Sequence, residues 1–527
     1  MKNPDLNRNN FVPVIAPSES YPNNRIMIVG GRPEDSSRAD QFHQDRHKSN
    51  HPSRKKRCHE GTADITLVNM NLLYVSYNDG IDHEIHPPLG LLYLISALEK
   101  KGHVVDFIDY QTFSLDQEGC DLFSVENVIH YFGEMSDIIG LSCMANLLPF
   151  TIMVAEKLKE RYPEKTIILG GVGSFGVEEL ILDRFPWIDV IVRGEGEVTM
   201  TELQESFSNH HRFSGIPGIS YRTANGKVVR NEDRKRIANL DSLAFPAYNR
   251  LTTDYYDAFN VITNRGCPFH CSFCSVAPVW GHSTTQRSHE NIIDEIRYLH
   301  ENYEVSQILF QDEFFYSSDA KIIDFCKKLI QSGLSITWKC FGRVNLVGQE
   351  AMGKMVEAGC VQIRFGVESA SDTVLSKIVK SFRFSQALDV VTRAVQLFDS
   401  VETFFIWGFP FESMNDFLTS VTQMARFQQI GVNVLPSLLS MLPQTKIYHD
   451  YCQGKYSGEL TLHHQLIPWV VVTGHEELGR ENQVPEKYAA HYELIRNHPD
   501  IFPGFYLFNY EKNIKPKLNI MRKMGFM

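Results

Sequence analysis

Short apolar runs alternate with amphipathic stretches along residues 64–205. Five of the runs have the length and composition of buried strands and lie at 65–69, 104–109, 137–142, 166–171 and 188–194. The stretches between them have helical periodicity, as in 89–101, where the apolar residues fall on one face before Gly102 ends the helix. This alternation is typical of βαβ units. The first part of the chain is therefore predicted to be α/β, with a doubly wound, Rossmann-like parallel sheet.

A second alternating series extends from about residue 251 to residue 450. Its predicted strands lie near 259–264, 307–311, 335–341, 361–367, 402–408 and 432–437. Helix signals separate these strands, for example Ser288 as a cap ahead of an apolar helix face. Six βα units with right-handed crossovers can curl into an incomplete barrel, whose chemistry lies at the carboxyl ends of the strands. We predict a partial, TIM-like (β/α)6 barrel.

The other segments have weaker patterns. Residues 1–60 are polar, lack periodicity and end in a basic run, so we expect a disordered extension. Residues 61–210 would hold the sheet domain, and residues 211–250 a connector with a hairpin turned at Asn225-Gly226 that separates two cores. After the barrel at 251–450, residues 451–527 form a small mixed cap region. Its histidines, including His463 and His491, are candidates for a substrate pocket by composition alone, and structural roles are favoured.

Composition narrows the class of protein. The 527 residues suffice for about three domains. Hydrophobic residues make up 43% and charged residues 22%, which excludes a wholly disordered or fibrous protein. The excess of 63 acidic over 52 basic residues, a net charge of −11, argues against nucleic-acid binding through the overall field. No apolar run reaches the roughly 18 residues of a membrane span, and no secretory signal is evident, so we expect a cytoplasmic protein.

Three of the ten cysteines are clustered. Cys267, Cys271 and Cys274 directly follow the first predicted strand of the barrel, whereas the other seven are scattered and are expected to be inert thiols. Three thiolates at this spacing can hold three irons of a 4Fe-4S cluster and leave the fourth iron without a protein ligand. Zinc is the alternative, because His270 and His282 lie nearby.

The cysteine spacing, placed after the first strand of a barrel, resembles the signature of the radical S-adenosylmethionine (SAM) enzymes. In that family SAM chelates the open iron, and the reduced cluster breaks a sulfonium bond, usually giving a 5′-deoxyadenosyl radical. The sheet domain resembles the cobalamin-binding domain that precedes the barrel in one large branch, through the segments PPLGLLYLISALEKKGH, GLSCMAN, ILGGVG and VRGEGE. The two resemblances cover about residues 64–450. Together they imply an enzyme with a 4Fe-4S cluster, SAM and cobalamin.

The resemblance also implies contacts to SAM from the barrel. Asp312 or Glu313, after the second strand, would accept the amino group of SAM, with an acidic helix start as the alternative. Arg343, after the third strand, falls where relatives keep an arginine near the cofactor, although a surface arginine is the alternative. Glu368 and Ser369, after the fourth strand, would contact the ribose hydroxyls or the methionine moiety. A helix cap is the alternative for Ser369.

The strand ends of the sheet domain would face cobalamin. The residues expected there are Ser142, Gly170, Gly171, Glu195 and Glu197. An axial histidine would come from an Asp-x-His-x-x-Gly segment, and the sheet domain has none. If cobalamin binds, its cobalt is therefore expected to lack a histidine from this motif. Without the cysteine loop, a nucleotide-binding domain would be the leading interpretation.

The function implied by the resemblance is methyl transfer to an unactivated carbon of a small molecule or natural-product intermediate. One SAM molecule would methylate reduced cobalamin, and another would yield the radical that removes hydrogen from the substrate, which then takes methyl from methylcobalamin. An external flavodoxin- or ferredoxin-like protein would supply electrons. Three alternatives stay open: a cobalamin-dependent oxidative cyclase or rearrangement enzyme, transfer of a 3-amino-3-carboxypropyl group, and a non-catalytic iron–sulfur or zinc-binding module.

Overall fold

A computed structural model describes most of the chain, within the compact unit Arg54–Met527. The described residues are 60–71, 73–77, 80–113, 121–207, 212–252, 255–256, 258–462 and 486–526, with the backbone alone for 73–77 and 80–84. The predicted N-terminal extension and His463 lie outside the described residues, apart from residue 60. Within the described part, no helix is both long enough and apolar enough to cross a bilayer.

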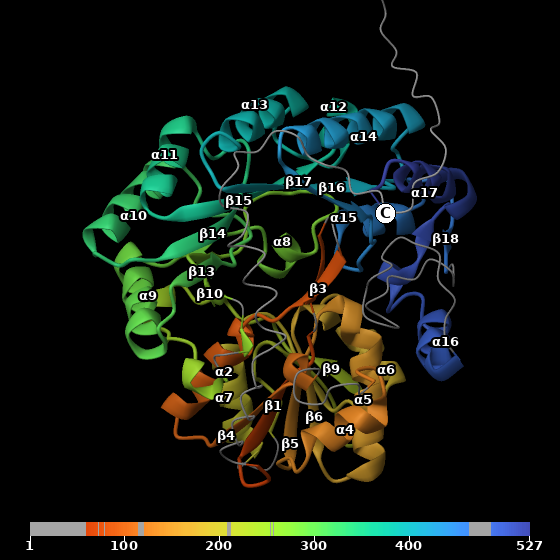
Figure 1. Ribbon diagram of the computed structural model, residues 1–527. Helices are drawn as coiled ribbons and strands as arrows, with labels where there is room; N and C mark the ends of the chain where they lie inside the picture. Colours follow the sequence, from red (N-terminus) through yellow and green to blue (C-terminus); the bar gives the residue numbers. More distant parts are fainter. Residues whose placement is uncertain are drawn as a thin grey trace, which may run out of the picture. The chain divides into compact units, whose positions relative to one another are not determined.

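The first domain is built on a seven-stranded sheet of order β4-β1-β5-β6-β7-β8-β9 (Figure 1). Its strands are β1 (Ile65–Asn69), β4 (Val105–Asp109), β5 (Ile138–Ser142), β6 (Thr166–Gly170), β7 (Val190–Val192), β8 (Ile219–Arg222) and β9 (Val228–Arg230). The first five in this order run parallel, as predicted. The hairpin predicted at Asn225-Gly226 is present as β8–β9, and it extends the sheet. It pairs antiparallel with β7, because the buried side chains of Ile219 and Tyr221 pack into the core beneath the sheet.

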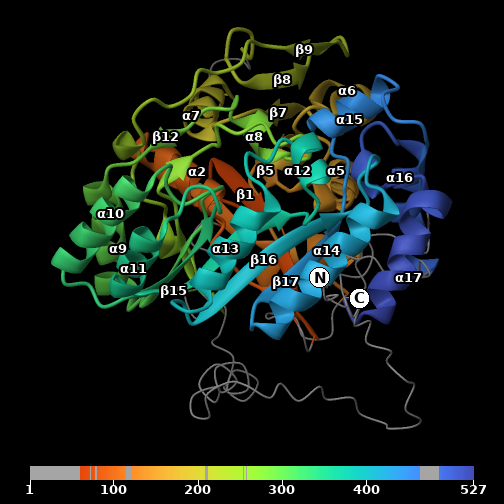
Figure 2. The ribbon, with the colours of Figure 1, turned by 90° about the horizontal axis from the view of Figure 1, so that it is seen from above.

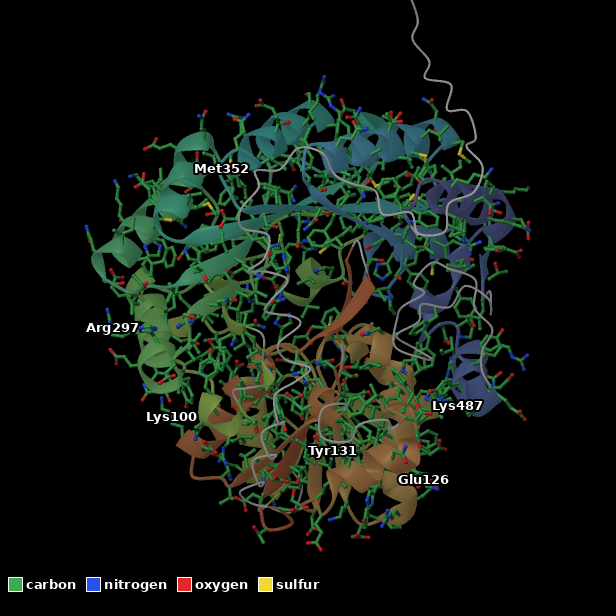
Figure 3. All side chains as sticks on the ribbon, in the orientation of Figure 1. Lys100, Glu126, Tyr131, Arg297, Met352 and Lys487 are labelled. Atoms are coloured by element: carbon green, nitrogen blue, oxygen red, sulfur yellow. The ribbon has the colours of Figure 1, made fainter. Side chains whose placement is uncertain are left out.

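Helices cover both faces of this sheet. They are α2 (Leu89–Lys100), α4 (Val125–Phe132), α5 (Leu148–Arg161), α6 (Glu178–Arg184) and α7 (Gly196–Phe207). Helices α2 and α7 pack together over one face, and α4 and α5 over the other. Exposed side chains such as Lys100 and Glu126 point outward from these helices (Figure 3). A separate hairpin of β2 (Leu73–Tyr77) and β3 (Gly80–Glu84) lies between β1 and α2 and was not predicted. The doubly wound fold is confirmed.

The second domain is a six-stranded parallel sheet of order β10-β13-β14-β15-β16-β17. Its strands are β10 (Phe259–Val261), β13 (Gln307–Phe310), β14 (Thr337–Gly342), β15 (Cys360–Glu368), β16 (Ser400–Trp407) and β17 (Asn433–Leu438). The helices are α9 (His289–Tyr303), α10 (Asp319–Gln331), α11 (Gln349–Glu357), α12 (Asp372–Lys377), α13 (Phe384–Ala394), α14 (Met414–Gln429) and α15 (Lys446–Cys452). Most of these helices lie outside the curved sheet (Figures 1 and 2). The first strand, β10, and the last strand, β17, do not pair with each other, so the sheet does not close. The predicted partial barrel is confirmed.

Buried and partly exposed side chains alternate along the barrel strands, and this alternation explains how the barrel wall is packed. On β14, Trp338 and Cys340 are completely buried, whereas the alternating residues Lys339 and Phe341 are partly accessible. The indole of Trp338 packs among Phe310, Phe315 and Phe325, and its nitrogen donates to the carbonyl of Ala358 at 2.7 Å. The apolar residues thus bind the strands to their helices and leave the other face of the sheet for the site.

The C-terminal region contacts both domains. Its elements are β18 (Leu460–Thr461), α16 (Ala489–Asn497), β19 (Leu507–Phe508), a π-helical turn (Tyr510–Ile514) and α17 (Lys515–Lys523). Helix α16 packs against α5 of the first domain. In the barrel, the buried ammonium of Lys517 lies 2.6 Å from the carboxylate of Glu412, just after β16. This region therefore ties the end of a barrel strand to the C-terminal helix.

Candidate active site

The three clustered cysteines lie in one loop at the carboxyl end of the barrel's first strand. This loop runs from β11 (Asn264–Arg265), which pairs with β12 (Thr285–Gln286), to α8 (Val276–Val279). All three thiols are free and partly accessible. Burial raises the pKa of Cys267 to about 11, and the nearby thiols of Cys271 and Cys274 add to this rise. The three sulfurs are thus close enough to influence one another.

Neighbouring elements hold this loop in place. The backbone amide of Gly266 donates to the carboxylate of Glu313 at 3.2 Å. In the middle of the loop, Ser272 donates its amide to the carbonyl of Ile378 at 3.1 Å and accepts from the amide of Ile447 at 2.9 Å. The loop is therefore fixed by the end of β13, by the segment after α12 and by the first turn of α15.

Arg343 lies against the cysteine loop and is buried, with 8% of its surface exposed. Its guanidinium carbon is 3.7 Å from the ring centroid of Phe269, and Nη1 lies 3.7 Å from the sulfur of Cys271. Within the described residues, Nη2 has no hydrogen-bond partner. These contacts argue against an ordinary surface arginine and favour a charge that faces the cluster site.

The two carboxylates after β13 have different surroundings. Asp312 is buried and accepts three hydrogen bonds, from the amide of Thr263 at 2.7 Å, its hydroxyl at 3.0 Å and the amide of Asn264 at 3.0 Å. Burial raises the pKa of Asp312 to about 7. Glu313 instead lines a cavity beside the loop. This geometry favours Glu313 over Asp312 as the acceptor for an ammonium group, because Asp312 holds the turn between β10 and β11.

Glu368 and Ser369 are adjacent at the end of β15 but face different partners. Glu368 has a left-handed φ of 68° beside an irregularity in the pairing with β16, and its carboxylate lies 2.9 Å from the ammonium of Lys380. Ser369 is completely buried, lies 3.1 Å from the hydroxyl of Ser420 and accepts the amide of Ser371 at 3.1 Å. These contacts favour the structural alternative for Ser369.

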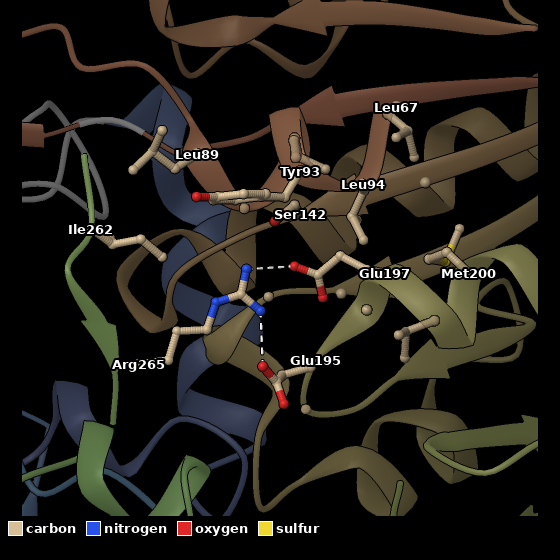
Figure 4. A pocket seen from close by; sticks show the side chains of 18 of the residues that line it. Leu67, Leu89, Tyr93, Leu94, Ser142, Glu195, Glu197, Met200, Ile262 and Arg265 are labelled. Carbon is tan, nitrogen blue, oxygen red and sulfur yellow. Dashed lines mark hydrogen bonds and ion pairs between the residues drawn. The ribbon is translucent and has the colours of Figure 1, made fainter. Parts of the chain in front are cut away.

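A cavity of about 310 Å³ lies between the strand ends of the sheet domain and the first barrel strands (Figure 4). Its lining includes Ser142, Gly170, Gly171, Glu195 and Glu197 from the sheet domain, and Ile262, Asn264, Arg265, Trp280, Gln311 and Glu313 from the barrel side. A side chain placed at Gly90, Gly170 or Gly194 would meet nothing within 4 Å. These glycines therefore leave the backbone open to a ligand. Among the described lining residues none is a histidine.

Arg265, which was not predicted from the sequence, forms part of this cavity wall. Its guanidinium donates to Glu195 at 2.8 Å and to Glu197 at 2.6 Å, and all three side chains are buried (Figure 4). The guanidinium also lies 5.0 Å from the ring centroid of Tyr93. The two carboxylates expected at cobalamin are thus held by a residue of the barrel side. The position of Arg265, just before Cys267, was the available signal.

The donors around the loop and cavity fit the groups that the resemblance implies. Three free thiols suit an iron–sulfur cluster, because each can bind a different iron. In the cavity wall, Oε2 of Glu197 and Oδ1 of Asn264 are buried acceptors with no partner among the described residues, and they suit the amide groups of a corrin.

The two histidines considered as zinc ligands contact each other. His270 stacks on His282 with 4.2 Å between the ring centroids, and Nδ1 of His282 lies 2.9 Å from the carbonyl of Phe269. In the described part of the chain, no three histidine, cysteine or acidic side chains are arranged to share one metal ion.

Comparison with known proteins identifies both domains. The Radical SAM superfamily model matches residues 261–424, and the B12 binding domain model matches residues 83–204. The Uncharacterized methyltransferase PH0819 of Pyrococcus horikoshii is 34% identical over 335 residues, which are 63% of this chain and 71% of that protein. This chain belongs to the radical SAM enzymes that carry a B12-binding domain. The predicted family is confirmed.

Two further similarities are informative about this radical SAM enzyme. The anaerobic magnesium-protoporphyrin IX monomethyl ester cyclase of Rubrivivax gelatinosus is 29% identical over 325 residues, 59% of this chain and 56% of that protein. The solved structure of the methyltransferase TsrM from Kitasatospora setae, with cobalamin and a 4Fe-4S cluster bound, has a TM-score of 0.59 at 18% identity and covers 74% of each chain. The similarity to the TsrM structure supports the fold of a Rossmann-like domain followed by a partial barrel.

Proposed function

We propose that this protein is a cobalamin-dependent radical SAM methyltransferase that transfers a methyl group to an unactivated carbon of a small molecule. The observation that carries the proposal is that the cysteine loop and the cavity of the B12-binding domain share a wall, formed by Arg265 and Glu313. When bound, the cluster and SAM supply a substrate-activating radical, and cobalamin carries the methyl group. The methyltransferase relative favours this outcome.

The barrel residues would divide the work at the cluster. Cys267, Cys271 and Cys274 hold three irons. Arg343 keeps a positive charge beside Cys271, which stabilises the negative charge of the thiolates, and its stacking on Phe269 fixes its direction. Glu313 accepts the amino group of SAM while it also holds the amide of Gly266.

Glu368 and the sheet domain would complete the cofactor sites. One carboxylate oxygen of Glu368 is paired with Lys380, and the other can accept a ribose hydroxyl of SAM. Ser142, Gly170 and Gly171 line the cavity where cobalamin would approach the backbone. Apolar side chains such as Leu67 and Met200 line the same cavity and would exclude water from it.

We also propose a small-molecule substrate and an external one-electron donor, flavodoxin- or ferredoxin-like. The TsrM structure that contains tryptophan shows that this fold accommodates such a substrate in one relative. A reducing compartment such as the cytoplasm suits the three thiols, because oxidation would block iron binding. Cell fractionation would test this location.

The test is anaerobic purification with cobalamin supplied, iron and sulfide analysis, and product analysis with SAM labelled in its methyl group. We expect four irons per chain, bound cobalamin, and label in a methylated product together with S-adenosylhomocysteine. Cys271→Ala should abolish the cleavage of SAM, whereas Cys360→Ala, a buried thiol of β15, should keep both iron and cleavage. Full activity of Cys271→Ala, or a protein without iron, would refute the proposal.

Oxidative cyclisation is the second candidate. The similarity to the anaerobic cyclase supports it, although this chain spans only 56% of the length of that relative. A cyclase would form 5′-deoxyadenosine without a methylated product and without S-adenosylhomocysteine. The labelling experiment therefore distinguishes the two reactions.

A further inference from the structure

Arg265 connects the two domains inside the cavity wall. Its two guanidinium nitrogens, Nη1 and Nη2, donate separately to Glu195 and Glu197, at the start of α7 in the sheet domain. A guanidinium is planar and presents its donors in a fixed fork, so both carboxylates hold its orientation. Because all three groups are buried, neither solvent nor salt strongly screens the attraction between the guanidinium and the two carboxylates.

The same residue begins the cysteine loop. Arg265 is the last residue of β11, and Gly266 and Cys267 follow it directly. Gly266 has a φ of 97°, and a side-chain carbon there would lie 2.1 Å from the carbonyl oxygen of Ser283. The backbone at this point therefore has little freedom. A displacement of the Arg265 backbone would therefore be passed on to Cys267 and to the amide that Gly266 gives to Glu313.

The two carboxylates that bind Arg265 differ in their other contacts. Glu195 is held by neighbouring residues, whereas one oxygen of Glu197 faces the cavity. Glu195 accepts the amide of Ile237 at 2.7 Å, and Arg236 donates to the carbonyl of Arg265 at 2.8 Å. Glu197 differs, because its Oε2 atom is buried in the cavity wall without a partner among the described residues. A ligand in the cavity can therefore reach Glu197 directly, while Glu195 anchors the guanidinium.

We propose that Arg265 is a positioning residue that couples the ligand of the B12-domain cavity to the geometry of the cysteine loop. A hydrogen-bond donor on the ligand binds Glu197, the carboxylate changes its hold on the guanidinium, and the first residues of the loop respond. Coupling between two sites is reciprocal, so the cluster changes the affinity for cobalamin by the same factor as cobalamin changes that for the cluster. This inference rests on the proposed function.

The experiment compares cobalamin affinity with and without the cluster. Equilibrium dialysis of hydroxocobalamin against the full chain, before and after anaerobic iron–sulfur reconstitution, gives two dissociation constants. For the unmodified protein we expect their ratio to be about five or more, the lower end of typical couplings. In Arg265→Met the ratio falls to about one. We also expect the electron paramagnetic resonance spectrum of the reduced cluster to change with cobalamin in the unmodified protein and to stay unchanged in Arg265→Met.

Two further variants separate coupling from folding. Arg234 pairs with Glu202 and Thr199 on the same helix α7, and its contacts in the described part of the chain do not include the cysteine loop. Arg234→Met should therefore keep the ratio of the unmodified protein. Arg265→Met leaves the buried carboxylate of Glu197 without its ion-pair partner, whereas Glu195 keeps the amide of Ile237 and Arg236 at 4.0 Å. The triple variant Glu195→Gln/Glu197→Gln/Arg265→Met removes all three charges and should fold. Because Glu197 lines the cobalamin cavity, we expect weaker cobalamin binding with a ratio that stays near one.

The outcomes are distinguishable from a failure of the proposed function. Three results overturn the coupling, even where iron and cobalamin are bound. The ratio of the two dissociation constants is near one in the unmodified protein, or the triple variant keeps the ratio of the unmodified protein, or Arg234→Met lowers the ratio as much as Arg265→Met does. A protein that binds neither group overturns the proposed function itself. A loss of coupling confined to the Arg265 variants supports the inference.

Discussion

Lys380 and Glu368 form a buried ion pair next to the cysteine loop, with 2.9 Å between the ammonium and the carboxylate. The ammonium also donates to the carbonyl of Gly366 at 3.0 Å and lies 5.8 Å from the ring centroid of Phe273 in the loop. Lys380→Met leaves the carboxylate buried and unpaired, which costs about 3–5 kcal/mol. We expect a clear fall in the melting temperature of the cluster-free protein, measured by calorimetry.

The control for this prediction is an exposed ion pair. Lys354 and Glu357 lie on the surface of α11, so Lys354→Met should change stability by at most about 0.5 kcal/mol. The double variant Glu368→Gln/Lys380→Met removes both charges and should recover most of the loss. If Lys380→Met and Lys354→Met lower the melting temperature equally, the ion pair of Lys380 and Glu368 does not contribute as a buried pair.

The conformation of Gly266 predicts a specific defect in cluster binding. Gly266→Ala places a methyl group 2.1 Å from the carbonyl oxygen of Ser283, so the backbone of the loop must shift. We expect a large loss of iron after reconstitution while the far-ultraviolet circular dichroism is kept. Gly281 also has a positive φ, but its Cβ position is open, so Gly281→Ala introduces conformational strain alone. If both variants lose iron to the same extent, the steric argument fails.

Val379 stores backbone strain beside the cluster site. It has a φ of 61°, which is rare for a β-branched residue, and its carbonyl oxygen lies 4.0 Å from the sulfur of Cys271. Asparagine tolerates this conformation, and Val379 is 43% exposed as a residue, so little packing is lost. Val379→Asn should therefore raise stability by about 1 kcal/mol, visible as a higher melting temperature. Val356→Asn, at an equally accessible helical position, should give no gain.

The order of the elements was predictable because helix and strand periodicity are local properties of the sequence. Each strand of the two predicted series has a counterpart in the structure. The pairing of β8 with β7 was not predictable, because it depends on a neighbour brought in by the fold. The hairpin β2–β3 was missed for a related reason. It pairs only with itself and has no place in a larger sheet.

The site was predictable to the same extent. The three thiols stand in one loop, so their spacing alone indicated a cluster site. The choice between Asp312 and Glu313 depends on the amides of Thr263 and Asn264, which lie 49 and 48 residues before Asp312. Arg265 was missed because its two carboxylate partners lie 70 and 68 residues earlier in the chain. Contacts of this range cannot be read from spacing.

His491 on α16 predicts a pH dependence of stability. It is buried, stacks on Phe150 with 5.5 Å between ring centroids, and neither ring nitrogen has a partner among the described residues. Burial lowers the pKa of His491 to about 4. Between this value and the ordinary pKa of about 6.5, the unfolded state binds a proton that the folded state does not. Stability therefore falls as the pH drops below about 6.5, by about 2 kcal/mol at pH 5.

The variant His491→Phe isolates this contribution. Phenylalanine keeps the ring against Phe150 and removes two buried nitrogens without partners, so we expect a gain of about 1–3 kcal/mol at pH 8. The gain should widen at pH 5, because the variant has no proton to bind at this position. Melting temperatures of both proteins at the two pH values measure the difference, and His130→Gln, at an exposed position on α4, should follow the unmodified protein. Parallel pH profiles for His491→Phe and the unmodified protein would show that the burial of this ring does not control its protonation.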